Sequence, residues 1–135
     1  MIDDLRRQFL VDEDLDEERL AALIKKLLPI CVVNKKGVVQ IKRSGLPGRD
    51  LVKIVLVARL VAHKLDESIP DELDAAALAA NTGMPRNQVA ARAKEVVDEA
   101  FAERTTRGNY RASLWKVNEF LEELTKQERG KDERD

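Results

Sequence analysis

Residues 51–65 form the segment that most constrains the fold of this chain. On a helix, at about 100° per residue, its polar side chains all fall on one side, and they are Lys53, Arg59, His63 and Lys64. The remaining surface of such a helix is apolar almost all round. A helix of this kind must be central, either in the core or partly in a subunit interface.

The composition indicates which elements surround this helix. The chain has 135 residues, a length that suits one domain, and 44% of them are hydrophobic while only 4% are aromatic. Abundant Ala, Leu and Val favour helices packed through aliphatic side chains over a β-sandwich. We therefore expect a mainly α fold with small β-hairpins, of the α+β class.

Two helices are expected near the N-terminus. Ile2, Leu5 and Phe9, at spacings of three and four, predict a short helix that lies on the body of the fold. An acidic first turn at Asp16 precedes an apolar stripe at i, i+3, i+4, i+7 and i+8, which ends before Pro29. This second pattern predicts an amphipathic helix.

A hairpin is expected between these helices and the central one. Residues 30–33 and 38–41 are rich in β-branched side chains, and the four residues between them end in Gly37. This pattern predicts two strands joined by a turn. After a loop at 45–48, Asp50 is placed to cap the central helix.

Residues 74–112 carry the most specific pattern in the chain. Asp74 can cap a short helix, Gly83 supplies the positive φ needed to leave it, and Pro85 fits the first turn of a second helix. Two short extended segments, 101–104 and 109–112, follow that second helix. The order predicts a helix-turn-helix and then a hairpin.

At these residues the sequence resembles the winged helix-turn-helix family. The positions that match the family's core are Leu78, Ala79, Gly83, Met84, Val89, Ala93 and Val96, and Arg107-Gly108-Asn109-Tyr110-Arg111 resembles its wing. The whole chain also resembles small uncharacterised archaeal proteins of this type. Ala100 departs from the pattern, because many such proteins carry Gly where the second helix ends.

The resemblance divides the chain into three parts. Residues 1–48 would be a helix and hairpin extension, and residues 49–124 the winged helix-turn-helix domain, whose last helix covers 113–124. Residues 125–135 would be a charged, disordered tail.

The resemblance implies binding to double-stranded DNA, with the second helix in a major groove and the wing on the backbone or minor groove. The side chains expected to reach base edges are Arg86, Asn87, Gln88, Ala91 and Arg92. Those expected at phosphates or in the minor groove are Lys94, Arg104, Arg107 and Arg111. The function implied is transcriptional regulation by occupancy of an operator.

The charges of the chain are sorted by segment although they nearly cancel in total. Residues 30–64 hold eight basic residues against one acidic residue, whereas 65–84 hold five acidic residues and no basic one. The basic residues around the first hairpin and its exit are Lys35, Lys36, Lys42, Arg43 and Arg49. They would either add a second surface for phosphates or only solubilise an exposed hairpin.

A second function stays open beside DNA binding. Helix-turn-helix units also serve as non-enzymatic modules for protein–protein interaction, and Trp115 lies off the apolar arc of the last helix, where it would suit a partner surface. Trp115 and the apolar central helix together favour a homodimer. Its DNA site would be palindromic, with half-sites about 10 bp apart.

The scarcity of reactive side chains limits the chemistry. A lone Cys31 and a lone His63 cannot build a zinc site from thiolates and imidazoles, and we expect no catalytic residues, metal or cofactor. No signal peptide or membrane-spanning stretch opens the chain. We therefore expect a cytoplasmic protein that is not an enzyme.

Overall fold

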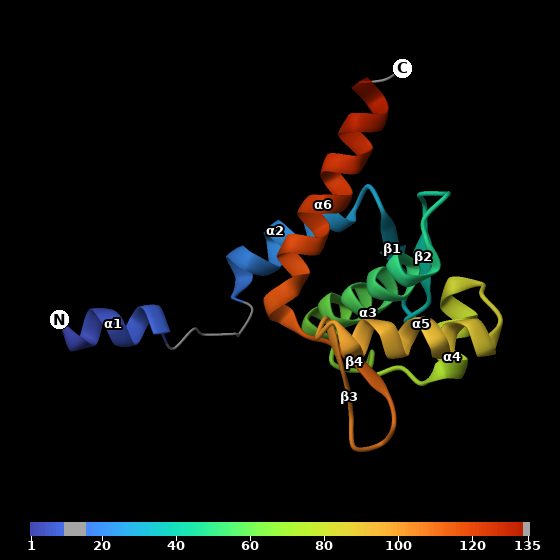
Figure 1. Ribbon diagram of the computed structural model, residues 1–135, viewed down its shortest axis with the longest axis horizontal. Coiled ribbons are helices and arrows are strands. Elements are labelled where there is room, and N and C mark those ends of the chain that lie inside the picture. Colours follow the sequence, from blue (N-terminus) through green and yellow to red (C-terminus); the bar gives the residue numbers. More distant parts are fainter. Residues whose placement is uncertain (10–15, 134–135) are drawn as a thin grey trace.

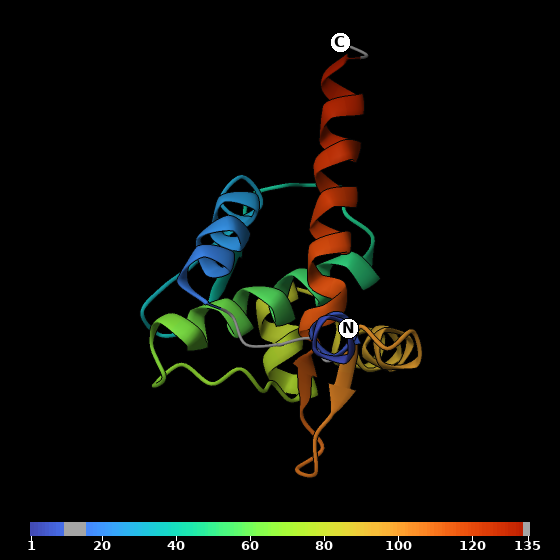
Figure 2. The same cartoon turned by 90° about the vertical axis from the view of Figure 1, so that its left-hand side faces the viewer.

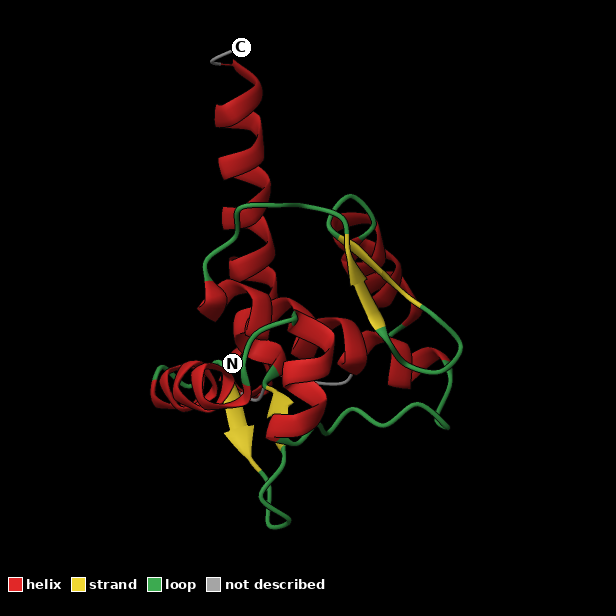
Figure 3. Cartoon of the chain, turned by 90° about the vertical axis from the view of Figure 1, so that its right-hand side faces the viewer, coloured by secondary structure: helices red, strands yellow, loops and turns green. Residues whose placement is uncertain are grey.

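The computed structural model describes residues 1–9 and 16–133. Within these residues the chain forms six helices and two small antiparallel hairpins, so the α+β class is confirmed (Figure 3). The elements are α1 (Ile2–Phe9), α2 (Glu17–Leu27), β1 (Cys31–Val33), β2 (Val39–Ile41), α3 (Gly48–Leu65), α4 (Ala75–Thr82), α5 (Arg86–Asp98), β3 (Ala102–Arg104), β4 (Tyr110–Ala112) and α6 (Leu114–Glu133).

Helix α3 runs through the middle of the molecule, as its apolar composition predicts (Figure 1). Val52, Ile54, Val55, Leu56 and Val57 are fully buried. Helices α2, α4 and α5 and strands β1, β2 and β4 all contact α3. The N-terminal extension therefore shares one hydrophobic core with the rest of the chain.

The start of α3 differs from the prediction. The helix begins at Gly48, and Pro47 occupies the cap position without a side-chain hydrogen bond. Because Gly48 and Arg49 are already helical, Asp50 lies inside the first turn and is not the cap. Its carboxylate stabilises the helix there through the helix dipole, not by bonding an end N–H group.

Helices α1 and α2 differ in what they contact. The carboxylate of Asp16 accepts a hydrogen bond from the Arg19 N–H (2.8 Å), and α2 packs against α3 and α6. In contrast, α1 projects away from the body, which corrects the prediction that it lies on the fold (Figure 1). Ile2 and Phe9 are 78% and 86% exposed. The spacing of apolar residues defines a face but does not show what that face meets.

The β1–β2 hairpin has the predicted strands and turn. Cys31 pairs with Ile41 and Val33 with Val39. In the turn, the side chain of Asn34 accepts hydrogen bonds from the backbone N–H groups of residues 36 and 38 (2.9 and 3.0 Å). The hairpin packs its buried side chains on α3.

Helix α6 is longer than predicted. It continues through Glu133, so the expected helix end at Leu124 is wrong, and most of the segment expected to be a disordered tail is helical. Residues 134 and 135 lie outside the described residues. Lys126 and Gln127 explain part of the extension because both favour helices and neither needs a core to pack on. Figure 2 shows α6 and the β3–β4 hairpin extending in opposite directions.

The backbone leaves α5 through Ala100, which has a φ of 63°. Its N–H donates to the Val97 carbonyl (2.9 Å), and the Phe101 N–H donates to the Val96 carbonyl (3.1 Å). These bonds end the helix with a left-handed residue, a position that usually holds Gly. Ala100 therefore adopts the conformation that the resemblance assigns to a glycine, at a steric cost.

Replacing Ala100 by Gly should therefore stabilise the protein. We expect Ala100→Gly to raise the free energy of unfolding by about 0.5–1 kcal/mol, because relief of the left-handed strain exceeds the added entropy of the unfolded chain. The matched control is Ala91→Gly, at an exposed position inside α5, which should lower stability by about 1 kcal/mol. Urea unfolding measures both changes. A loss of stability in Ala100→Gly would contradict this explanation of the helix end.

Candidate nucleic-acid interface

Local hydrogen bonds fix the turn between α4 and α5. Asp74 caps α4 by accepting from the Ala77 N–H (2.8 Å), and Gly83 ends it with a φ of 78° and an N–H bond to the Ala79 carbonyl (2.9 Å). Both features were predicted. Met84 then packs its sulfur against Gly48 at the start of α3. A Cβ at Gly48 would lie only 2.9 Å from this sulfur, so a larger residue there would require the Met84 side chain to shift.

Asn81 adds a bond that the sequence did not reveal. Its Oδ1 accepts from the Val39 N–H (2.8 Å), and its Nδ2 donates to the Ala77 carbonyl (2.7 Å). The side chain therefore joins α4 to strand β2, 42 residues earlier in the chain. Nothing in the local pattern marks such a long-range partner.

Helix α5 presents two different faces. Val89, Ala93 and Val96 are buried, as predicted from their spacing. The predicted contact residues on the opposite side and in the first turn are exposed, and they are Arg86, Asn87, Gln88, Ala91 and Lys94. Helix N-termini attract anions, so the first turn combines the helix dipole with a guanidinium and two amides.

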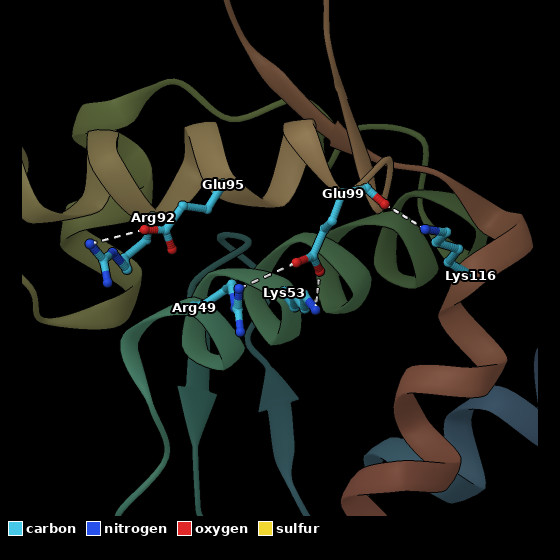
Figure 4. Close-up of polar contacts among 6 residues, drawn as sticks. All are labelled: Arg49, Lys53, Arg92, Glu95, Glu99 and Lys116. Atoms are coloured by element: carbon cyan, nitrogen blue, oxygen red, sulfur yellow. Dashed lines mark hydrogen bonds and ion pairs between the residues drawn. The ribbon is translucent and has the colours of Figure 1, made fainter.

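Arg92 lies differently from the other predicted contacts on α5. It is half-buried, and its guanidinium pairs with the Glu95 carboxylate at 3.1 Å (Figure 4). The pair partly neutralises Arg92 within its own helix. Arg92 would therefore have to leave a carboxylate partner before it could bind a ligand, and the Asn87 Oδ1 is likewise engaged, because it accepts from the Gln88 N–H (3.0 Å).

The β3–β4 hairpin positions three predicted arginines. The Arg104 guanidinium lies over the Tyr110 ring, 5.9 Å from its centroid, and Arg107 is exposed in the turn. The Glu103 carboxylate accepts hydrogen bonds from Arg111, which raises the pKa of Arg111. Register explains this pair, because Glu103 and Arg111 are opposite each other on neighbouring strands.

Two hollows connect these side chains. The first, here called the interface cleft, brings Arg86, Asn87 and Ala90 of α5 together with Arg104, Gly108 and Tyr110 of the hairpin, and Asp74 and Ala75 also line it. The second lies beside the hairpin and is lined by Glu72, Glu103, Arg104, Thr105, Thr106, Arg107 and Arg111. Arg104 belongs to both. Through Arg104, the hollow that Arg86 of α5 lines adjoins the hollow that Arg107 and Arg111 of the hairpin line, whereas Arg92 and Lys94 line neither.

The basic residues near the first hairpin do not form one cluster. Lys35 and Lys36 are exposed in the β1–β2 turn. Lys42 donates to the Leu28 carbonyl (3.1 Å), Arg43 donates to the Leu124 carbonyl (2.9 Å), and Arg49 pairs with Glu99. Three of the five cations are thus engaged by the protein itself, in three separate places.

Glu99 and its partners, here called the Glu99 cluster, join the end of α5 to the core (Figure 4). The carboxylate pairs with Lys53 and, at 3.6 Å, with Arg49, both on α3. Lys116 of α6 donates to the Glu99 carbonyl. Lys53 is only 14% exposed and lies over the rings of Phe101 and Phe120. Sequence reasoning missed the cluster, because Glu99 lies far along the chain from Lys53 and Arg49 and no local pattern marks them as partners.

The remaining predicted residues have simple surroundings. Trp115 is 64% exposed at the start of α6, with the Lys116 ammonium 4.9 Å from its ring centroid. Cys31 is buried, and burial raises the pKa of its thiol to about 11. His63 shares a hydrogen bond with the Ile69 carbonyl (2.7 Å).

Metal-binding clusters and membrane-spanning helices are both absent from residues 1–9 and 16–133. These residues contain no group of three or more His, Cys, Asp or Glu side chains placed to hold a metal ion. No helix in this part of the chain is both long and apolar enough to cross a membrane.

Comparisons of the chain with known protein families, with characterised proteins and with solved structures found no match.

The Glu99 cluster leads to a prediction about stability. We expect Glu99→Gln to lower the free energy of unfolding by about 1–3 kcal/mol, because the largely buried Lys53 ammonium loses its carboxylate partner. The matched control is Glu95→Gln, whose more exposed pair with Arg92 should contribute less than about 0.5 kcal/mol. Urea unfolding compares the two variants. Equal effects would show that the Glu99 cluster does not hold α5 to the core.

Proposed function

We propose that the chain is a winged helix-turn-helix protein that binds double-stranded DNA and regulates transcription by occupying an operator. In this proposal α5 is the recognition helix, the β3–β4 hairpin is the wing, and α3 and α4 support them. The order of elements agrees with the resemblance of residues 74–112 to that family. The proposal includes no catalytic step and no cofactor.

One observation carries the proposal. Arg86 and Asn87 at the start of α5 line the same cleft as Arg104 of the hairpin. A helix in a major groove and a wing on the neighbouring backbone must present their contacts to one surface, so a shared cleft between these two elements favours DNA. A helix-turn-helix used only as scaffold would not require this arrangement.

The side chains suit the proposed roles. Arg86 can pair bidentately with guanine, Asn87 or Gln88 with adenine, and Ala91 can contact a thymine methyl group. Among the basic residues, Lys94, Arg104, Arg107 and Arg111 would contact phosphates or the minor groove. Arg92 would join the base contacts after leaving Glu95.

Acidic residues on the same surface would lower the affinity for DNA. Asp74 lines the interface cleft, and Glu72 and Glu103 line the hollow beside the hairpin. Glu99 is turned toward α3 by its pairs with Lys53 and Arg49, so it opposes phosphates less than its position in the sequence suggests. A mixed surface favours selective over indiscriminate binding.

A second candidate is a non-enzymatic module for protein–protein interaction. The observation that favours it is the exposure of Trp115, because a large aromatic side chain left in solvent is common in interface hot spots. Trp115 is not among the residues lining either hollow of the proposed DNA surface. The two functions therefore require different residues.

The DNA function predicts a salt-dependent affinity that relies on the cleft. Arg86→Ala and the double variant Arg104→Ala with Arg107→Ala should each weaken binding, and the slope of log K against log salt should become shallower by about one for each phosphate that is no longer neutralised. Lys25→Ala, at an exposed site on α2, is the control and should bind like the wild type. Gel-shift titration with genomic fragments at several salt concentrations measures this. No retardation at low salt, or no difference between the variants, would defeat the proposal.

Neutralising Glu103 should have the opposite effect. We expect Glu103→Gln to tighten DNA binding by about two- to fivefold, because the change frees Arg111 and removes a charge that repels phosphates. Glu119→Gln, at an exposed site on α6, removes the same charge elsewhere and should change affinity little. The same titration reports both. Weaker binding by Glu103→Gln would show that the pair orders the hairpin for DNA.

A further inference from the structure

Helix α1 has an apolar face that the described part of the chain, residues 1–9 and 16–133, leaves exposed. Ile2, Leu5 and Phe9 lie on one side of the helix and are 78%, 54% and 86% exposed. The helix has only eight residues, and a helix this short is not stable in water without tertiary contacts. Its apolar face therefore needs a partner surface.

The body of the same chain carries an uncovered apolar groove. The groove lies between α2, β1 and the C-terminal half of α3, and side chains that line it include Ile24, Leu28, Val32, Val61 and Leu65. Leu28 and Leu65 are large apolar side chains that remain about half exposed or more. Exposed apolar surface of this kind is typical of an interaction site.

We infer that α1 of one molecule docks in this groove of a second copy, and that the second copy returns the same contact, which produces a two-fold homodimer. The helix would insert its apolar face between α2 and α3 of the partner. Helix-in-groove binding uses side chains at spacings of three and four, as Ile2, Leu5 and Phe9 provide. Because the exchange is mutual, the interface is closed and does not propagate.

Charge complementarity supports this occupant. Beside its apolar face α1 carries Asp3, Asp4 and Arg6. Lys35 and Asp66 are among the charged residues lining the groove. The acidic residues of α1 can therefore pair with Lys35, and Arg6 can pair with Asp66, while the apolar side chains of α1 are buried.

The area available fits a weak dimer. Burying three apolar side chains removes about 100 Å² each, the groove contributes less than that, and reciprocity brings the total to somewhat under about 1,200 Å². This is the size of weak and transient protein–protein contacts. The dimer should therefore be reversible with concentration.

The position of α1 favours exchange over folding back on its own groove. The helix projects away from the body of its own chain (Figure 1). Its apolar face is open to solvent and within reach of another molecule. In an isolated chain, the apolar face of α1 and the groove both remain exposed. In the dimer, each chain's α1 fills the groove of the other chain, so both surfaces are buried in both chains.

Light scattering of the full-length protein without DNA tests the inference. The wild type should reach twice the chain mass of 15.2 kDa at micromolar concentrations, while Leu5→Asp and Leu28→Asp should each remain monomeric. Both positions are exposed, so the substitutions should not disturb folding. Val38→Asp, at an exposed apolar site that does not line the groove, is the matched control and should stay dimeric. Trp115→Asp distinguishes this interface from one formed at Trp115, and it should stay dimeric because Trp115 does not line the groove.

Mixing the two monomeric variants sharpens the test. The Leu28→Asp chain keeps an intact α1, and the Leu5→Asp chain keeps an intact groove, so the mixture should recover one of the two docked helices and form a weaker heterodimer. A monomeric wild type, a dimer that survives Leu5→Asp and Leu28→Asp, or a Trp115→Asp variant that is monomeric would each overturn the inference. Because no DNA is present, failure here is distinct from failure of the proposed DNA function.

Discussion

The structure depends on the need of α3 to be covered on almost every side. Nine of its 18 residues are buried, and both hairpins and the helices α2, α4 and α5 contribute to that cover. Helix α5 packs on α3 and buries Val89, Ala93 and Val96 in the shared core, which leaves the polar side of α5 facing outward. Burial of one helix thereby determines which face of another helix remains available for a ligand.

The junction between α5 and the β3–β4 hairpin sets the geometry of the proposed DNA surface. Ala100 turns the chain with a positive φ, and Phe101 packs edge-on against Phe120 with ring centroids 5.2 Å apart. Lys53 lies over both rings and pairs with Glu99, so one cation connects α3, α5 and α6. The hairpin therefore has a defined position relative to α5, and Arg86 and Arg104 can share a cleft.

Local signals made much of the fold predictable from the sequence. Asp74 and Gly83 act within three or four residues of their own position, and each has the predicted role. Asp16 was expected in the first turn of its helix and instead caps it, one residue earlier. The strands of both hairpins likewise lie within the predicted segments. These features depend on the chain's nearest neighbours, which a single sequence displays.

Features that depend on distant residues were not predictable in the same way. The start of α3 displaced Asp50 from the cap, and α6 passes the predicted end at Leu124. The pairs of Arg49 with Glu99 and of Arg43 with the Leu124 carbonyl join residues 50 or more positions apart. Such contacts determine which of the predicted cations remain free to face solvent. The sequence pattern does not reveal them, because it shows only neighbouring residues.

The most direct test of the proposed DNA surface is a residue-by-residue map of the contact. Nuclear magnetic resonance of ¹⁵N-labelled protein, titrated with a short DNA duplex, reports each backbone amide. We expect the shifts to concentrate in the first two turns of α5 and in residues 103–108 of the hairpin. Shifts centred on Trp115, or an unchanged spectrum at low salt, would contradict the proposed DNA surface.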